Sequence, residues 1–295
     1  MSDNEALDTQ ICTPQPFLKW AGGKRGLLPE ISSRIPRFSG TYFEPFLGAG
    51  AVFFDQSPGR KKIVSDSNRD LIEVYEVIRD NCGALIEALS THKNTKEHYY
   101  AVRGWDREDD FSQKWSKVER AARFIFLNKT TFNGLYRVNA RGQMNVPFGS
   151  QSTANWVQRD VLTAVSRFLG TRDPDGNLTA QLSSGDYREI TRLARPGDFV
   201  YLDPPYAGTF THYQSGGFGP AQQEELRDEI LRLSEAGVPV LLSNSDVPLV
   251  HELFSNEKGL TTEYVGIRRM IGASKESRVR VREVLVNNFH LIGEK

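Results

Sequence analysis

The stretch DFVYLDPPY, residues 198–206, places an acid and two prolines directly behind a short apolar run. An apolar run without polar alternation is typical of a strand that is buried on both faces of a parallel sheet. We therefore expect Asp203 at the carboxyl edge of such a sheet, where open α/β sheets bind their ligands. The stretch predicts an α/β fold with a candidate functional acid at the end of a buried strand.

Segments typical of strands and of amphipathic helices alternate along much of the chain, which predicts a mostly parallel sheet. A helix is expected from Ser67, because Leu71, Tyr75 and Ile78 follow it with helical spacing. Another helix is expected around Ile230. The expected strands are residues 40–46, 61–65, 198–202, 238–246 and 282–289.

The segment between residues 67 and 159 departs from this alternation. Residues 81–127 have the pattern of polar helices, and the acidic DREDD at 106–110 within them is expected to be a solvated loop. We therefore assign residues 1–66 and 160–295 to one α/β domain, which the segment 67–159 interrupts as an insertion.

Two turn signals lie in the second half of this insertion, in KTTFNGLYRVNARGQMNVPFG at residues 129–149. Asn133-Gly134 and Arg141-Gly142 separate short β-prone runs, and an Asn-Gly step is typical of tight hairpin turns. The stretch therefore predicts a β-hairpin module.

The size and composition are those of a soluble globular protein, with 295 residues, 39% hydrophobic and 25% charged. No apolar run approaches the roughly 18 residues that a membrane span needs, and the polar start MSDNEALDTQ is unlike a signal peptide. We therefore expect a cytoplasmic protein without membrane contact. The two cysteines, Cys12 and Cys82, and the scattered histidines indicate neither a disulfide framework nor a metal site.

The formal net charge is zero, which argues against a protein that coats nucleic acid nonspecifically, but the charges are unevenly distributed. No acid occurs between Glu119 and Asp160, and a second basic stretch spans residues 268–283. Either cluster alone is typical of a solvated surface. Two clusters that flank a ligand-binding sheet edge favour contact with a phosphate backbone. The basic residues of the first are Arg120, Arg123, Lys129, Arg137, Arg141 and Arg159.

The stretch YFEPFLGAGAVFF, residues 42–54, combines a strand, a turn with Gly48 and Gly50, and the start of a helix. Such a turn lets a ligand lie against backbone N–H groups. Asp66 ends the next expected strand, where an acid can accept hydrogen bonds from the two hydroxyls of a ribose. Capping of the following helix is an equally good interpretation of Asp66 taken alone.

In combination, these stretches resemble the DNA adenine-N6 methyltransferases, and most closely the Dam-like, D12-class, alpha-group enzymes. The resemblance covers nearly the whole chain in family order, with PFLKWAGGKRGLLPEI, YFEPFLGAGAVFF, the hairpin stretch, YLDPPY and VREVLVNN. It implies a Rossmann-like, S-adenosylmethionine-dependent methyltransferase sheet, with residues 67–159 as an inserted DNA target-recognition domain. The implied cofactor-binding residues are Trp20, Lys24, Glu44, Pro45, Phe46, Gly48, Gly50, Asp66, Asp186 and Asp203.

The resemblance assigns catalysis to the DPPY residues Asp203, Pro204, Pro205 and Tyr206. Adenine N6 is a poor nucleophile because its lone pair is delocalised into the ring, and positive charge grows on it during methyl transfer. The Asp203 carboxylate and the Pro204 carbonyl are suited to accept its hydrogens and to stabilise that charge. The prolines fix φ, and Tyr206 offers a flat face for a base flipped out of duplex DNA.

The resemblance further implies that the hairpin reads duplex DNA, with GATC as the expected site. Phe132 would insert beside the flipped adenine, Arg137 would contact guanine O6 and N7, and Pro147 would lie against a thymine methyl. Lys19 would reach the first guanine. Relatives with longer sites such as GATATC carry a similar hairpin, so the match indicates a GAT-like core more directly than the full site. The expected DNA-binding residues are Lys19, Lys129, Phe132, Asn133, Leu135, Arg137, Asn139, Arg141, Pro147, Arg268, Arg269 and Arg278.

Other activities stay open at this point. Cytosine-N4 methylation uses the same chemistry, although its motif more often begins with Ser, so Asp203 favours adenine. A non-catalytic DNA-binding protein that retains the fold, or a small-molecule methyltransferase, would carry the same pattern. Cytosine-C5 methylation is unsupported, because it needs a Cys after Pro, whereas Cys12 and Cys82 follow Ile and Asn. A cognate restriction endonuclease acting on the same site is a partner that the resemblance allows.

Overall fold

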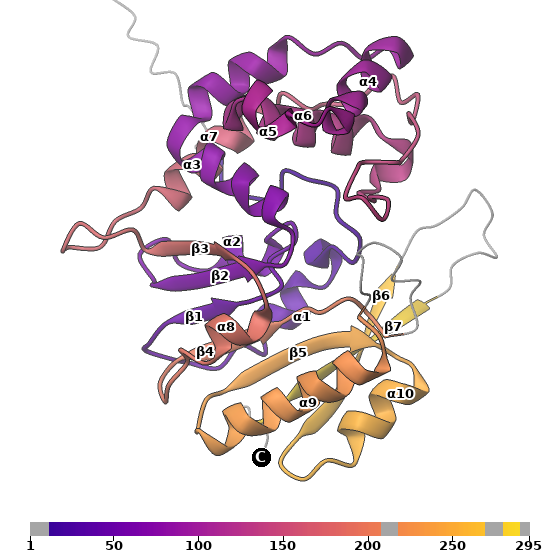
Figure 1. Ribbon diagram of the computed structural model, residues 1–295. Helices are drawn as coiled ribbons and strands as arrows, with labels where there is room; N and C mark the ends of the chain where they lie inside the picture. Colours follow the sequence, from indigo (N-terminus) through magenta and orange to yellow (C-terminus); the bar gives the residue numbers. More distant parts are fainter. Residues whose placement is uncertain (1–11, 208–217, 269–279, 290–295) are drawn as a thin grey trace, which may run out of the picture.

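Strand β4, Phe199–Leu202, lies in the middle of a seven-stranded sheet, and all of its residues are buried. The strand order is β3-β2-β1-β4-β5-β7-β6, and β7 runs antiparallel to both of its neighbours while the other pairs are parallel (Figure 1). The computed structural model describes residues 12–207, 218–268 and 280–289. The expectation of a mostly parallel α/β sheet is confirmed.

The expected strands all occur, and β3 and β6 are additional ones that the sequence pattern did not indicate. Phe43 of β1 pairs with Ile63 on one side and Val200 on the other, which places the ends of β1, β2 and β4 side by side. The remaining strands are β1 Tyr42–Glu44, β2 Lys62–Asp66, β3 Ala180–Ser184, β5 Val240–Ser245, β6 Thr261–Arg268 and β7 Arg280–Asn287.

The helices begin at residues with recognisable capping chemistry. Asn68, rather than Ser67, caps α3, because its Oδ1 accepts a hydrogen bond from the Leu71 N–H (3.1 Å). None of the described helices is both long and apolar enough to cross a lipid bilayer. The helices are α1 Leu28–Ser32, α2 Ala51–Asp55, α3 Arg69–Ser90, α4 Lys96–Arg103, α5 Phe111–Lys114, α6 Lys117–Thr130, α7 Arg159–Leu169, α8 Tyr187–Thr191, α9 Pro220–Glu235 and α10 Pro248–Val250.

Helices cover both faces of the sheet because successive side chains of a strand point to opposite sides. Phe199 and Tyr201 of β4 pack in a core with α1, α2, α3, α6 and α7, whereas Val200 and Leu202 pack with α8 and α9. Figure 1 shows α3 to α7 towards the top of the view and α9 and α10 at the bottom. The sheet therefore lies between two helical layers.

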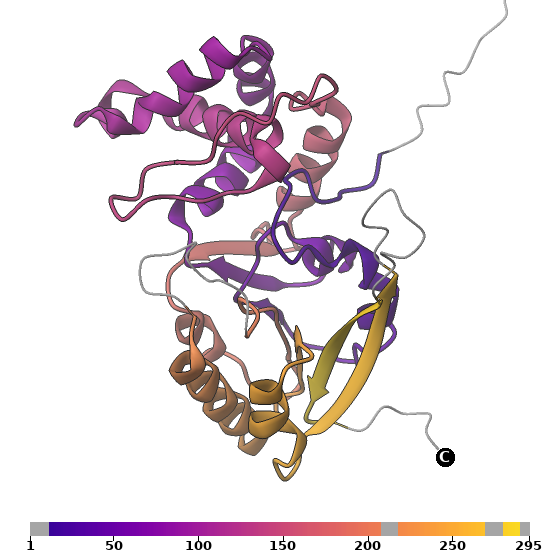
Figure 2. The same ribbon diagram turned by 90° about the vertical axis from the view of Figure 1, so that its right-hand side faces the viewer.

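Helices α4, α5 and α6 lie away from α9 and α10, at the end of the molecule where α3 and α7 also lie (Figures 1 and 2). A small separate core joins α4 and α6 to the irregular segment after α6, through Tyr99, Phe126, Met144 and Val146. Figure 2 shows this irregular segment between the helices and the sheet. Helix α6 also contributes Ala121, Ala122, Phe124 and Ile125 to the main core, so this one helix joins the two cores.

Candidate functional site

The carboxyl ends of β1, β2 and β4 border a cavity of about 1030 Å³. Such an edge is the usual ligand site of open α/β sheets, and the volume suits a drug-sized ligand. The structure brings all of the expected cofactor-binding and catalytic residues to this cavity. They are Trp20, Lys24, Glu44, Pro45, Phe46, Gly48, Gly50, Asp66, Asp186, Asp203, Pro204, Pro205 and Tyr206.

The glycines after β1 are required by their backbone conformation and by close neighbours. Gly48 and Gly50 have φ values of 49° and 72°, in the left-handed region. A Cβ atom on Gly48 would lie 2.8 Å from the ring of Trp20, and one on Gly50 would lie 3.0 Å from the Tyr75 hydroxyl. The turn thus brings its backbone against the indole of Trp20 at the cavity wall.

Asp66 joins this turn to the start of α3. Its two carboxylate oxygens accept hydrogen bonds from the backbone N–H groups of Gly48 and Asn68, both at 2.9 Å. Burial raises the pKa of Asp66, and the two backbone donors oppose that rise. Asn68, not Asp66, caps α3, so the structure favours a role of Asp66 at the cavity over the capping interpretation.

Asp203 follows β4 and forms an ion pair with Lys24, whose Nζ lies 2.7 Å from Oδ1. The Ser243 hydroxyl of β5 donates a hydrogen bond to the same oxygen (2.9 Å). Burial raises the pKa of Asp203, whereas the Lys24 charge and both hydrogen bonds lower it. These partners favour the ionised carboxylate in a buried position.

Tyr206 lies over the same ion pair. Its ring centroid is 4.5 Å from Lys24 Nζ, and its hydroxyl donates a hydrogen bond to Glu283 of β7. Burial and the neighbouring acids Asp203 and Glu283 raise the pKa of Tyr206, so its hydroxyl stays protonated. The Tyr206 side chain is therefore fixed at two points, at its ring by Lys24 and at its hydroxyl by Glu283.

The cavity carries six acidic and three basic side chains. Burial raises the pKa of Glu44 well above its ordinary value, and the surplus of the five other acids over the three basic residues suits a ligand with positive charge. Tyr187 of α8 stacks on Phe46 (5.2 Å between ring centroids), and its buried hydroxyl has no hydrogen-bond partner among the described residues. Asp186 lines the cavity and also forms two 2.8 Å contacts with Arg188. The acidic residues of the cavity are Glu44, Asp66, Asp186, Asp203, Glu225 and Glu283, and the basic ones are Lys24, Arg188 and Arg282.

Residues 20–266, which include the whole cavity apart from Arg282 and Glu283, match one protein family, described as D12 class N6 adenine-specific DNA methyltransferase. The chain belongs to the D12 class of N6 adenine-specific DNA methyltransferases. It is therefore an enzyme that methylates N6 of adenine in DNA, and membership implies dependence on S-adenosylmethionine. The alternatives of cytosine-N4 methylation and of a small-molecule methyltransferase are set aside by this finding.

Relatives of this D12-class methyltransferase match over almost its full length. The type II methyltransferase M1.LlaDCHI of Lactococcus lactis subsp. cremoris is 40% identical, over 93% of this chain and 95% of that protein. The type II methyltransferase M.MjaIII of Methanocaldococcus jannaschii is 34% identical, over 93% of this chain and 99% of that protein. The DNA adenine methylase of Escherichia coli K12 is 32% identical, over 91% and 93%.

The hairpin stretch of the D12-class enzyme forms irregular paired backbone rather than regular strands. Isolated antiparallel bridges link Thr131 to Phe148 and Val138 to Met144. The turn signals occur as expected: Asn133 and Gly134 both have positive φ, and so does Gly142 at the second turn. The predicted hairpin is thus present with short, interrupted pairing.

Several of the expected DNA-binding residues are exposed on this hairpin. Phe132 is 52% exposed, unusual for a large apolar side chain. Arg137, Arg141 and Pro147 are exposed, and Arg137 Nε donates to Asn145 Oδ1 (2.8 Å). Asn133 is exposed as well, whereas Leu135 and Asn139 are half-buried.

Lys19 lies against the hairpin at its first turn, where a Cβ atom on Gly134 would be 2.2 Å from the Lys19 side chain. The Asn128 side chain of α6 holds the Lys19 backbone, accepting from its N–H (2.8 Å) and donating to its carbonyl (2.7 Å). Trp20, the next residue, stacks on Tyr136 of the hairpin (5.8 Å between ring centroids). The N-terminal segment therefore contacts both the cavity and the hairpin.

Two residues of the acid-free basic segment face inward. Arg120 binds Glu73 through contacts of 2.9 and 2.6 Å, and Arg123 forms an ion pair with Asp106 (2.7 Å). The positive field expected from this segment is correspondingly smaller. Lys129 is 3.4 Å from Gln158 Oε1, and burial together with nearby cations lowers its pKa to about 8. Of the second basic cluster, the Arg268 side chain and all of Arg269 and Arg278 lie outside the described residues.

Sequence reasoning missed two kinds of functional neighbour. Ser243 and Glu283 come from strands distant in sequence, and no local pattern marks them as partners of Asp203 and Tyr206. Asp106 belongs to the acidic run expected to be a solvated loop, yet its side chain is only 11% exposed. The expectation was wrong for Asp106, which is the partner of Arg123, whereas Asp109 and Asp110 are exposed as expected.

Proposed function

We propose that the enzyme transfers a methyl group from S-adenosylmethionine to N6 of an adenine flipped out of duplex DNA, within the sequence GATC. The observation that carries this proposal is the half-buried Asp203, paired with Lys24 at a cavity whose lining includes Leu135 and Tyr136 of the hairpin. Residues 67–159 would form the target-recognition domain, and residues 1–66 and 160–295 the catalytic domain.

The cofactor would lie in the cavity against the turn of Gly48 and Gly50, with Trp20 and Asp66 beside it. The fit rests on the surplus of acidic side chains, which suits a sulfonium, and on the buried, unpartnered hydroxyl of Tyr187, which suits a polar ligand atom. When bound, S-adenosylmethionine supplies an electrophilic methyl group on positively charged sulfur.

The Asp203 carboxylate would accept a hydrogen bond from the N6 amino group and so localise the nitrogen lone pair. As the N–C bond forms and the methyl–sulfur bond breaks, positive charge moves from sulfur to N6, and a preformed negative charge would stabilise that transition state. Loss of one N6 proton would then give the neutral methylamino group. Lys24 and Ser243 keep Asp203 ionised and oriented before the base arrives. Tyr206 would stack on the flipped base, which cannot react inside the duplex.

The hairpin would read the target site from its exposed side. Phe132 would fill the space of the flipped adenine, Arg137 would bind guanine O6 and N7, Pro147 would contact a thymine methyl, and Lys19 would reach the first guanine. Bidentate recognition of guanine by arginine is worth about 1 to 3 kcal/mol of discrimination against another base.

Methylation of random-sequence duplexes, followed by sequencing of the products, tests this proposal. Modified adenines are expected in GATC, and Arg137→Ala is expected to relax the guanine requirement. Methylation that ignores the bases flanking adenine would contradict the hairpin assignment, and a longer preferred site would replace GATC.

A cognate restriction endonuclease is a second proposal, favoured by the two relatives that are named type II methyltransferases. Extracts of the source cells should then cleave an unmodified duplex that carries the target site and spare the same duplex after methylation. Equal survival of both duplexes would favour a solitary methyltransferase.

A further inference from the structure

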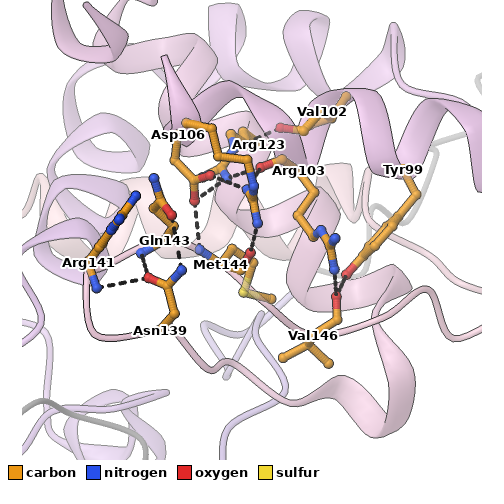
Figure 3. A network of polar contacts seen from close by, with 11 residues as sticks. Tyr99, Val102, Arg103, Asp106, Arg123, Asn139, Arg141, Gln143, Met144 and Val146 are labelled. Atoms are coloured by element: carbon orange, nitrogen blue, oxygen red, sulfur yellow. Dashed lines mark hydrogen bonds and ion pairs between the residues drawn. The ribbon is translucent and has the colours of Figure 1, made fainter. Parts of the chain in front are cut away.

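The hairpin is attached to the helices through its backbone, by side chains of α4 and the following 3-10 turn, Gly104–Arg107 (Figure 3). Met144 is held at both of its backbone polar groups: its N–H donates to Asp106 Oδ2, and its carbonyl accepts from Arg107, each at 2.7 Å. The Val146 carbonyl accepts from Tyr99 (2.8 Å) and from Arg103 (2.9 Å). Side chains therefore make the hydrogen bonds to the Met144 and Val146 backbone that a neighbouring strand would otherwise make.

The side chains of the same run divide into two faces. Met144 and Val146 are 2% exposed and pack in the small core, whereas Pro147 is exposed and Asn145 accepts a hydrogen bond from Arg137. Alternate residues of an extended chain point to opposite sides. The attachment therefore acts directly behind the face that carries the residues proposed to read DNA.

Asp106 is the central group of this attachment, as Figure 3 shows. Its carboxylate binds Arg107, the Met144 N–H and Arg123 of α6, and the Arg123 guanidinium also donates to the carbonyls of Val102 and Arg103, both at 2.9 Å. Arg123 and Asp106 are 9% and 11% exposed, so loss of Asp106 would leave Arg123 as a buried cation without its ion-pair partner. The pair links α6, α4 and the hairpin at one point.

We propose that Asp106, held by Arg123, is a positioning residue that sets how sharply the enzyme discriminates its target site. This inference rests on the proposed role of the hairpin in reading DNA. A base contact requires placement of the reading side chain to within a fraction of an ångström. Loss of the Asp106 attachment would let Arg137 and Asn145 vary in position, and Asp106 itself lies outside the lining of the cofactor cavity.

The chain supplies a matched control for the substitution Asp106→Asn. Arg120 lies one turn before Arg123 on α6 and is bound to Glu73 of α3, with both side chains mostly buried (17% and 20% exposed). In the described part of the chain, this pair has no hydrogen bond to the hairpin. Glu73→Gln therefore removes a comparable ion pair of α6 without releasing Met144. Tyr99→Phe is a second test, since it deletes only a hydroxyl, which donates to the Val146 carbonyl and to Thr131 Oγ1.

The experiment first reads the preferred site of the full-length enzyme from a random duplex library. It then compares initial methylation rates on that site and on a site with one guanine replaced, for each variant. We expect the ratio of the two rates to fall about 10-fold in Asp106→Asn, equivalent to ~1.4 kcal/mol, and by a smaller factor in Tyr99→Phe. Cofactor affinity should stay within about twofold, and Glu73→Gln should keep the wild-type ratio.

An unchanged ratio in folded Asp106→Asn would overturn the inference, and so would an equal fall in Glu73→Gln. If Asp106→Asn does not fold, Tyr99→Phe decides in the same way. Arg137→Ala, measured in parallel, separates this inference from the proposed function. A ratio lowered by Arg137→Ala but not by loss of the attachment leaves the reading role in place and removes the positioning role. If neither Arg137→Ala nor loss of the attachment lowers the ratio, the reading role and the positioning role are both refuted.

Discussion

Lys24 Nζ and Asp203 Oδ1 lie 2.7 Å apart, and this ion pair joins the glycine-rich segment near the N-terminus to the end of β4. Lys24 is 3% exposed and Asp203 is 19% exposed, so solvent screens the pair only weakly. Burial raises the pKa of Asp203, and Lys24 is the strongest influence that lowers it. The charge of the acid therefore depends on the lysine.

Asp203→Ala should lower kcat by at least about 100-fold, because in the proposed mechanism the carboxylate stabilises charge that forms in the transition state. Duplex affinity should change little, as measured by fluorescence anisotropy. Asp198→Ala is the control, since Asp198 precedes β4 at its other end and binds the Thr41 N–H (2.7 Å). Unchanged turnover in Asp203→Ala would refute the catalytic assignment.

Lys24→Met should shift the acidic limb of the kcat–pH profile to higher pH. The proposed mechanism requires ionised Asp203, and removal of the lysine should raise the pKa of that carboxyl further. Ser243→Ala should shift the limb in the same direction by less, because it deletes one hydrogen bond and no charge. The profile is measured at saturating cofactor. A rate reduced equally at every pH would show that Lys24 does not act through Asp203.

Asp66→Ala should weaken S-adenosylmethionine binding about 10-fold or more, measured by titration calorimetry, with a smaller effect on DNA affinity. The substitution removes the acceptor of the Gly48 N–H and so also releases the turn. Asp173→Ala is a matched control, because Asp173 accepts backbone N–H bonds from Asp175 and Asn177 outside the cavity. Equal losses for both ligands would argue against separate sites.

DNA affinity should fall steeply as salt rises, although the net charge is zero. Lys129→Met should reduce the slope of log affinity against log salt by about 1 at pH 7. The pKa of Lys129 is lowered to about 8, so its charge is lost as pH rises through that value. At pH 9 the variant and the wild-type enzyme should therefore converge. A constant difference from pH 7 to 9 would contradict the expected titration.

His92 should make the folded protein sensitive to acid. It stacks on Phe126 and contacts His98 Nε2 (2.9 Å), and burial followed by the charge of His98 lowers its pKa to about 4. The folded state binds fewer protons than the unfolded state, so this stability is complete above pH ~6.5 and is lost towards pH 4. Between pH 7.5 and 5 the loss should be about 2 kcal/mol.

Urea unfolding of the wild-type protein and of His92→Gln at these two pH values measures this loss. The variant should be less stable at pH 7.5 and should lose less stability on acidification. An identical loss in both proteins would assign the acid sensitivity to other groups.

Much of the fold could be predicted because buried parallel strands and tight turns leave local marks. The apolar run before Asp203 and the glycines at 48 and 50 predicted β4 and the turn after β1 correctly. β3 could not be recognised, since its sequence AQLSS is polar and only Ala180 is buried. β6 was missed as well, because TTEYVGIR has no clear alternation.

The candidate site was predicted as a set of residues but not as a set of contacts. Every residue expected at the cavity lines it, yet the pairing of Lys24 with Asp203 depends on how two distant segments meet. The inward direction of Arg123 was hidden for the same reason, because its partner Asp106 lies in a different turn. Composition shows that charges are present, and only tertiary structure shows which of them cancel.

The two hydrogen bonds between the Asn128 side chain and the Lys19 backbone have a thermodynamic consequence. Lys19 packs on the hairpin turn and the adjoining Trp20 forms part of the cavity wall, so a displacement at one position is transmitted across a single peptide bond. Suppose that cofactor binding shifts the Trp20 indole and so changes the affinity for duplex DNA by some factor. Duplex DNA must then change the affinity for the cofactor by the same factor, because thermodynamic linkage is reciprocal. If Trp20 binds the cofactor and Lys19 binds DNA, as proposed, these two adjacent residues would make the two ligands heterotropic effectors of each other.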